Sequence, residues 1–303
     1  MGLLSKWVES LDYEYEILLS CTRHRSPHST CQKCVAACED QAISIVKGKP
    51  VLDHSKCVQC GRCMAACPVQ AIAGIYPQRN IIQNQLVMSD KSIPTSKELL
   101  ILYKRGIKSI ICEEKSTIQL WKEPIDEANT SLKELGESPF SISKVKSARE
   151  EESYSRREIF SLWKTESKSL LHQFTPAKWR FNNNSFDLTK YYSDYQFTKV
   201  SLNSVKCTLC GVCQRICEKK CFEIQKEHFA INLKGCSSCQ LCVDTCPEKA
   251  IKIEVKILKL EETLFPVYEK VCHVCNHTFN TLREQDDECV ACNKLKSFKK
   301  GEE

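Results

Sequence analysis

The chain has 303 residues, enough for two or three domains, and 42% of them are hydrophobic, which excludes a globally disordered protein. Its twenty-two cysteines exclude a small secreted disulfide scaffold, because such scaffolds reach high cysteine numbers in much shorter chains. The formal net charge of +6 counts cysteine as neutral, and metal-bound thiolates would bring it to about −4, so the basic composition does not indicate a nucleic-acid partner.

Neither a secretion signal nor a membrane span is expected from the sequence. The first twenty residues contain Glu9, Asp12, Glu14 and Glu16 and no long apolar run. No stretch approaches the roughly eighteen apolar residues of a spanning helix. Dense cysteine without a secretion signal is typical of metal binding in a reducing compartment, so we expect a cytoplasmic protein.

The first cysteine-rich block lies within residues 1–80, which we expect to form one module. Its regularly spaced cysteines occur in the runs CQKCVAAC and CVQCGRCMAACP. The segments AISI and AIAGI follow these runs, and their apolar alternation predicts a short strand after a helical turn. The seven cysteines are Cys31, Cys34, Cys38, Cys57, Cys60, Cys63 and Cys67.

Residues 81–150 carry no cysteine run and are expected to form a small α/β insert. TSKELLILYKRG has apolar residues at helical spacing and ends at Gly106, and IKSIIC predicts the strand that follows. A second helix toward Gly136 and a strand over 140–142 repeat this order, as in a βαβ unit. Cys112 ends the first strand, where we expect a buried thiol, with a redox-active thiol as the alternative.

Residues 151–199 are expected to link the insert to the second cysteine-rich block. The segment starts with charged and serine residues and continues as an amphipathic helix. The chain contains no glycine-rich dinucleotide motif and no P-loop, so no small-molecule substrate is predicted. The apolar positions of the predicted helix are Ile159, Phe160, Trp163, Leu170 and Leu171.

The second cysteine-rich block, residues 200–258, repeats the spacing of the first. Eighteen residues separate Cys38 from Cys57, and eighteen again separate Cys217 from Cys236. An internal repeat of this kind predicts two copies of one module. The eight regularly spaced cysteines of this block are Cys207, Cys210, Cys213, Cys217, Cys236, Cys239, Cys242 and Cys246.

A ninth cysteine of this block, Cys221, falls outside the regular spacing. It stands four residues after Cys217, where the other half-repeats carry Ala42, Ala71 and Ala250. Free cysteine behaves as a small hydrophobe when it is buried. We therefore expect Cys221 to fill a small buried position and not to bind metal.

Residues 259–303 contain two C-x2-C pairs separated by thirteen residues, which resemble a zinc ribbon or a rubredoxin-like knuckle. Four thiolates complete a tetrahedral site, so His273 and His277 are expected at the surface. We favour a structural zinc, because no aromatic–glycine pattern follows either pair, and iron is the alternative. The expected metal ligands are Cys272, Cys275, Cys289 and Cys292.

The two cysteine-rich blocks resemble bacterial-type ferredoxins that carry two 4Fe–4S clusters. The ferredoxin run C-x2-C-x2-C-x3-C-P, present in full from Cys57 and from Cys236, gives three ligands to one cluster, and its fourth cysteine crosses to the other. Glu39 and Glu218 replace the proline after two of the crossing cysteines. We expect ligation to survive, because proline mainly shapes the backbone there.

The resemblance implies four clusters with crossed ligands. The first would take Cys31, Cys34 and Cys67 with one further ligand, and the second would take Cys38, Cys57, Cys60 and Cys63. The third would take Cys207, Cys210, Cys213 and Cys246, and the fourth would take Cys217, Cys236, Cys239 and Cys242.

The fourth ligand of the first cluster is open between three alternatives. Cys21 could bind across the nine-residue segment TRHRSPHST, His28 could bind in register, or neither binds and a three-iron cluster results. We favour Cys21, because thiolate is the softer ligand for iron and loop length costs little. The segment carries Arg23 and Arg25, which either are solvated or form a positive collar that raises the potential of this cluster or docks an acidic partner.

These patterns predict an α+β protein in which two ferredoxin-like dicluster modules flank a small α/β insert, with a zinc-ribbon-like knuckle at the C-terminus. The resemblance implies an electron-transfer protein that relays single electrons to or from a partner oxidoreductase, as its subunit or accessory. The alternatives are a redox enzyme with its thiol at Cys112 and a cluster-bearing scaffold protein for assembly.

Overall fold

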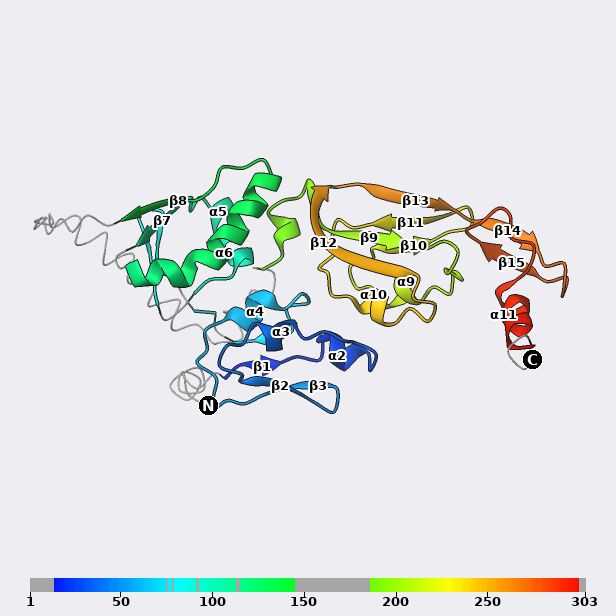
Figure 1. Ribbon diagram of the computed structural model, residues 1–303, viewed down its shortest axis with the longest axis horizontal. Coiled ribbons are helices and arrows are strands. Elements are labelled where there is room, and N and C mark those ends of the chain that lie inside the picture. The colour runs from blue at the N-terminus through cyan, green and yellow to red at the C-terminus, as the bar shows by residue number, and fades with distance from the viewer. Residues whose placement is uncertain are drawn as a thin grey trace, which may run out of the picture. The chain divides into compact units, whose positions relative to one another are not determined.

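The computed structural model of the chain describes residues 14–74, 76–77, 79–90, 93–112, 115–144 and 186–299 (Figure 1). Helices and strands are mixed throughout these ranges, in agreement with the α+β prediction. The amphipathic helix predicted from Ile159 to Leu171 lies outside the described residues. Among the helices that the structure describes, none is long and apolar enough to cross a membrane.

The chain divides into two compact units. The first unit contains residues 1–21 and 32–187, and the second contains residues 22–31 and 188–303. The short segment Thr22–Cys31 therefore belongs to the second unit, although it lies between cysteines of the first block in the sequence. No pattern in the sequence signals this placement.

The first cysteine-rich block folds into two small antiparallel ladders and two short helices. Strand β1 pairs with β4, and β2 pairs with β3. Apolar side chains of the strands and of α4 form the core, including Tyr15, Ile43, Met64 and Ile72. The elements are β1 (Glu16–Ile17), α3 (Lys33–Ala36), β2 (Ile43–Val46), β3 (Lys49–Leu52), α4 (Arg62–Ala66) and β4 (Ile72–Ala73).

The insert is a four-stranded sheet of order β5-β6-β7-β8 with two helices between its strands. The pairs β6–β7 and β7–β8 are parallel, so the predicted alternation of helix and strand is confirmed. Trp121, Leu99, Ile110 and Leu132 are fully buried in the core. The elements are β5 (Ile81–Ile82), β6 (Gln85–Val87), α5 (Ser96–Lys104), β7 (Ser109–Cys112), α6 (Lys115–Glu134) and β8 (Ser141–Lys144).

A buried ion pair lies where the insert follows the first cysteine-rich block. The Arg79 guanidinium donates two hydrogen bonds of 2.7 Å to the carboxylate of Glu98, and the two side chains are only 7% and 5% exposed. The Tyr76 hydroxyl donates to the same carboxylate. The Thr95 hydroxyl accepts the amide of Glu98 and caps α5.

The second cysteine-rich block has the same plan as the first. Strand β9 pairs with β12. Strand β11 pairs with β10 along one edge and with β13 along the other. Strand β9 begins at Tyr195, within the range predicted as linker. The elements are η1 (Leu188–Lys190), β9 (Tyr195–Leu202), α9 (Val212–Ile216), β10 (Phe222–Ile224), β11 (His228–Asn232), α10 (Leu241–Asp244), β12 (Ile251–Lys259) and β13 (Glu262–Pro266).

Equivalent backbone hydrogen bonds confirm the internal repeat. The amide of Leu18 donates to the carbonyl of Ala71 at 2.7 Å, and the amide of Asn203 donates to the carbonyl of Ala250 at 2.8 Å. The hairpin β2–β3 and the hairpin β10–β11 have the same register relative to the preceding cysteine run. All four strands predicted after the cysteine runs are present, as β2, β4, β10 and β12.

The C-terminal region forms a hairpin followed by a helix. Strands β14 (Tyr268–Val271) and β15 (Thr278–Thr281) pair antiparallel, and α11 (Val290–Lys299) follows. The turn between the strands contains the first C-x2-C pair, and the second pair lies at the start of α11. The knuckle motif is therefore placed on a hairpin and a helix N-terminus.

Candidate metal centres

One local structure recurs at the end of all four cysteine runs. The residue three positions after the last cysteine has a left-handed backbone, with φ between 49° and 52°. The next amide donates to the sulfur of that cysteine at 3.2 to 3.5 Å. These hydrogen bonds stabilise a thiolate. The cysteines and their donors are Cys38 with Ala42, Cys67 with Ala71, Cys217 with Cys221, and Cys246 with Ala250.

The three complete C-x2-C-x2-C loops also share their backbone conformation. Each loop contains two left-handed residues, one before and one after its second cysteine. Gly61 and Gly211 occupy the second of these positions in two loops, where glycine adopts a positive φ without strain. These turns wrap three thiols around one volume. The left-handed pairs are Gln59 and Gly61, Leu209 and Gly211, and Ser238 and Gln240.

The predicted ligands of the second cluster lie together in the first module. Burial raises the pKa of Cys63 to about 12, and the neighbouring Cys60, Cys57 and Cys38 contribute to this shift. Four thiols this close repel one another as thiolates, so they are stable as ligands only when a cation compensates their charge. The crossing cysteine, Cys38, is thus brought to the three cysteines of the following run.

The predicted ligands of the third cluster also lie together. Burial raises the pKa of Cys213 to about 12, and Cys207 and Cys210 raise it as well. Burial likewise raises the pKa of Cys207, with contributions from Cys210 and from Cys246. Cys246 belongs to the other run, so thiols of the two runs lie within electrostatic reach of each other, as the crossing pattern implied by the ferredoxin resemblance requires.

The fourth set is assembled around α10. Burial raises the pKa of Cys242, and Cys239, Cys236 and Cys217 add to the effect, as does Cys213 of the third set. Cys217 is the crossing cysteine of the preceding run, so all four predicted ligands lie within electrostatic reach of one another. These thiols pack against the core of the second module together with Phe222 and Phe229.

Cys221 is buried, as predicted, but it also contacts two of these thiols. It is 2% exposed, and the equivalent Ala42, Ala71 and Ala250 are at most 3% exposed. A hydrogen bond from the Cys221 thiol lowers the pKa of Cys217 to about 6. The same thiol lowers the pKa of Cys236 to about 7. In the structure the thiol donates to the carbonyl of Lys219 at 3.9 Å, and its proximity to Cys217 and Cys236 is a feature that the comparison with alanine did not suggest.

Cys21 follows the strand pair of the first module as Cys207 follows that of the second, but one residue sooner. Its amide donates to the carbonyl of Leu18 at 3.0 Å, and the amide of Cys207 donates to the carbonyl of Asn203 at 3.0 Å. Leu18 and Asn203 are equivalent, because both continue the strand pair before the first cysteine. Cys21 also packs against the core that contains Cys67, together with Cys34.

His28 lacks the surroundings of an in-register ligand. It is exposed, and its amide donates to the Ser26 hydroxyl at 3.2 Å. Gln32 has a φ of −132° at the position where the complete loops have a left-handed residue, so this run does not form the same turn. Cys31 is half-buried within the segment held by the second unit, and its carbonyl accepts a hydrogen bond from Arg23.

Tyr15 supports the loop of the second cluster and was not identified from the sequence. Its hydroxyl donates to the carbonyl of Gln59 at 2.9 Å, which fixes one of the left-handed residues of the loop. Burial raises its pKa, and Cys63 and Cys60 raise it further. A tyrosine directly before the two-residue strand β1 offers no signal of this role in the sequence alone.

The four cysteines of the knuckle form a compact group. Their sulfurs all lie within 4.8 Å of one another, and those of Cys275 and Cys289 are 3.8 Å apart. Sulfurs bound at about 2.3 Å to one tetrahedral ion are separated by about this distance. The amide of Cys289 donates to the sulfur of Cys272 and lowers its pKa to about 6. His273 and His277 are exposed, as predicted.

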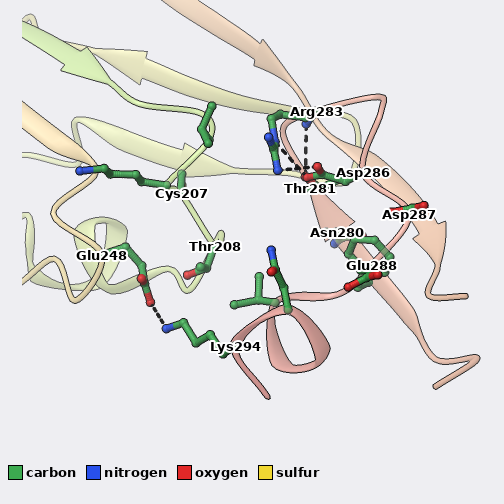
Figure 2. Close-up of a pocket in the computed structure, with 15 residues that line it drawn as sticks. Cys207, Thr208, Glu248, Asn280, Thr281, Arg283, Asp286, Asp287, Glu288 and Lys294 are labelled. Carbon is green, nitrogen blue, oxygen red and sulfur yellow. Dashed lines mark hydrogen bonds and ion pairs between the residues drawn. The ribbon is translucent and has the colours of Figure 1, made fainter. Parts of the chain in front are cut away.

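A cleft of about 590 Å³ lies between the knuckle and the loop of the third cluster (Figure 2). Cys207 and Thr208 line one side, and Arg283 lines the other. Lys294 of α11 forms an ion pair with Glu248, which follows Cys246 by two residues. The knuckle is thereby attached beside the third set of thiols, within the second unit.

The thiol sets fit iron–sulfur ligation, since each complete set combines four thiols with amide donors to sulfur. Comparison with protein families agrees: residues 29–71 match a 4Fe-4S dicluster domain, and residues 233–249 match a 4Fe-4S binding domain. Both segments are ferredoxin-like, and the chain is an iron–sulfur protein. No curated protein matches the chain. Cys21, the run from Cys207 to Cys217 and the knuckle lie outside the two matched segments.

Proposed function

We propose that the chain is an electron carrier that holds four 4Fe–4S clusters and relays single electrons to or from a partner oxidoreductase. The ligand sets are those that the ferredoxin resemblance implies, with Cys21 as the fourth ligand of the first cluster. The observation that carries the proposal is the turn found at all four crossing cysteines, in which an amide donates to sulfur. Hydrogen bonds to sulfur are one of the factors that set cluster potentials.

Cys21 is proposed as a ligand because it has the strand connection of Cys207 and packs with Cys34 and Cys67. His28 offers an exposed imidazole on a turn unlike those of the complete loops. The longer distance in sequence from Cys21 to Cys31 adds little entropy cost once both ends are fixed.

The knuckle is proposed to hold a structural zinc. Its four thiols approach the spacing of a tetrahedral ion, and no larger cluster is required to satisfy them. The segment has few buried apolar residues of its own, so the metal would supply much of its folding free energy. Iron at the same site would add a fifth redox centre.

The partner is proposed to be a protein redox centre. Clusters of this kind transfer electrons without a substrate pocket, and the rival thiol at Cys112 is 2% exposed within β7. A cytoplasmic location is proposed from the sequence, because dense cysteine without a secretion signal is typical of metal binding in a reducing compartment.

A redox titration followed by EPR tests the proposal. Anaerobically prepared protein should show four one-electron reductions, and the reduced protein should return electrons to a one-electron acceptor without any other substrate. Turnover of a substrate by the chain alone would instead indicate an enzyme. Iron that is labile and below one cluster per ligand set would indicate a scaffold.

A further inference from the structure

The segment Thr22–Cys31 is held in the second unit by two polar residues. The guanidinium of Arg25 lies 3.2 Å from Oε1 of Glu218 and donates to the carbonyl of Ile216 at 2.9 Å. Thr30 donates from its amide and its hydroxyl to the two carboxylate oxygens of Asp244, at 2.8 and 2.9 Å. Four polar contacts therefore attach this insertion to α9 and α10.

All of these contacts are adjacent to proposed ligands of the fourth cluster. Ile216 and Glu218 flank Cys217, and Asp244 follows Cys242 by two residues. Arg25 is also close enough to Cys239 to lower its pKa, against the burial that raises it. The positive charge of Arg25 thus lies beside this ligand set, on the residues that flank Cys217.

In the first module, an arginine also pairs with the glutamate that follows the crossing cysteine. Glu39 follows the crossing cysteine Cys38 as Glu218 follows Cys217. Glu39 forms an ion pair with Arg62, which belongs to α4 of the same module. Each of the two glutamates that replace the expected proline therefore has an arginine partner.

The second module cannot supply this arginine from its own helix. The residue equivalent to Arg62 is Leu241, which is 1% exposed in the core. Arg25 instead forms the ion pair with Glu218. Its side chain is 21% exposed, close to the 26% of Arg62. The insertion between Cys21 and Cys31 thus brings in the charge that the helix lacks.

We propose that Arg25 is a positioning residue for the fourth cluster, which holds the insertion on Cys217 through Glu218 and Ile216 and raises the reduction potential of that cluster. The inference deepens the proposed function and rests on it. Arg62 has the same role toward the second cluster. The sequence had suggested that the insertion forms a collar for the first cluster, whereas the contacts of Arg25 are with the ligand set of the fourth.

The physical reason is electrostatic. Reduction adds one electron and no proton to the cluster, so no bond forms or breaks and the ligand set gains one negative charge. A fixed cation nearby stabilises the reduced state. Because Arg25 is partly exposed and paired with Glu218, its effect is screened. We expect roughly a three- to tenfold effect on the reduction equilibrium, where tenfold corresponds to 59 mV for one electron.

The test compares Arg25→Gln with Arg25→Lys in the full chain, by EPR during titration with dithionite. A Cys239→Ser variant identifies the signal of the fourth cluster. Arg25→Gln should lower the potential of the fourth cluster by the stated fold-change and leave the other three unchanged. Arg25→Lys should recover most of the shift, because it keeps the charge. Arg62→Gln should lower the potential of the second cluster in the same way.

The matched control is Arg215→Gln, which removes an exposed arginine of α9 between Cys213 and Cys217. A smaller shift than that of Arg25→Gln supports the inference. Equal shifts for the two variants, or an unchanged fourth cluster in fully loaded Arg25→Gln protein, would overturn it.

Amide hydrogen exchange provides a second readout that does not depend on the potential. The amide of Thr30 should be protected in the wild-type chain and should exchange faster in Arg25→Gln. Unprotected exchange at Thr30 in the wild type would overturn the attachment. Iron content separates the proposed function from this inference. Wild-type protein without a fourth cluster contradicts both of them. Fully loaded protein in which the variants have no effect contradicts only the inference.

Discussion

Cys21 and His28 compete for one ligand position of the first cluster. The Cys21 amide donates to Leu18, the equivalent of the Asn203 that accepts from Cys207, although Cys21 follows one residue sooner, and His28 is exposed. We expect Cys21→Ser to abolish or alter the EPR signal of one cluster, because serine oxygen is a harder ligand for iron. His28→Ala should leave four intact signals. A normal set of signals in Cys21→Ser protein would exclude Cys21.

Cys221 provides a second prediction for a single side chain. Its thiol lies near Cys217 and Cys236, and its replacement by alanine recreates the residue present in the other three half-repeats. Because thiol hydrogen bonds are weak, we expect Cys221→Ala to lower the potential of the fourth cluster by about 0.5 kcal/mol, or about 20 mV for one electron. Redox-titrated EPR measures the shift.

Cys112→Ala is the control for Cys221→Ala, since Cys112 is equally buried but lies in the insert. It should leave all four potentials unchanged. A Cys221→Ala protein with a wild-type fourth potential would show that the thiol acts only as a space-filling group.

At the scale of single residues, the sequence predicts which cysteines form each ligand set but not which other side chains contact them. Spacing alone is sufficient to indicate that Cys63 lies with Cys38, because the run has a fixed loop geometry. The roles of Tyr15, Arg25 and Arg62 depend on contacts between residues far apart in the chain. Such contacts have no local pattern, so a single sequence does not indicate them.

At the scale of helices and strands, one buried ion pair stabilises the connection between the first cysteine-rich block and the insert. Arg79 and Glu98 are almost fully buried and doubly hydrogen-bonded. Glu98→Gln leaves the guanidinium without its charged partner, so we expect a loss of about 3 kcal/mol in the free energy of unfolding of the insert. Hydrogen exchange of the amides of β7 measures this loss.

The exposed pair Lys104–Glu137 is the matched control for Glu98→Gln. Partly exposed pairs contribute little, so Glu137→Gln should cost about 0.5 kcal/mol in the same measurement. Equal losses in the two variants would contradict the role assigned to the buried pair.

Tyr76 makes the stability of the same connection depend on pH. Burial and the neighbouring Glu98 raise its pKa above the ordinary value. Because the pKa is raised in the folded state, the contribution to stability is complete below about pH 10 and is lost as the pH rises further. We expect the insert to be destabilised more steeply above pH 10 in the wild type than in Tyr76→Phe. Hydrogen exchange between pH 8 and pH 11 tests this, and identical slopes would contradict it.

The elements show where sequence reasoning succeeds. The four strands after the crossing cysteines and the alternation in the insert follow from local apolar patterns, and both are found. Strand β9 begins within the predicted linker, and its pairing with β12, which is far away in the sequence, is a tertiary contact. The placement of Thr22–Cys31 in the second unit depends on tertiary contacts that no periodicity encodes.

For the whole molecule, the internal repeat determines the function that we propose. Two copies of one module carry the sixteen cysteines, with Cys21 counted, that we propose as cluster ligands, and the three complete runs are wrapped by tight turns. The knuckle is attached beside the third set through Lys294 and Glu248. An arrangement of this kind is suited to holding several redox centres in one chain.

The most direct test is the content of iron, acid-labile sulfide and zinc in anaerobically purified full-length protein. The account predicts about sixteen iron atoms, about sixteen sulfides and about one zinc per chain, since each of four clusters holds four irons. Colourless protein that binds only zinc, or whose cysteines are joined as disulfides, would contradict the account.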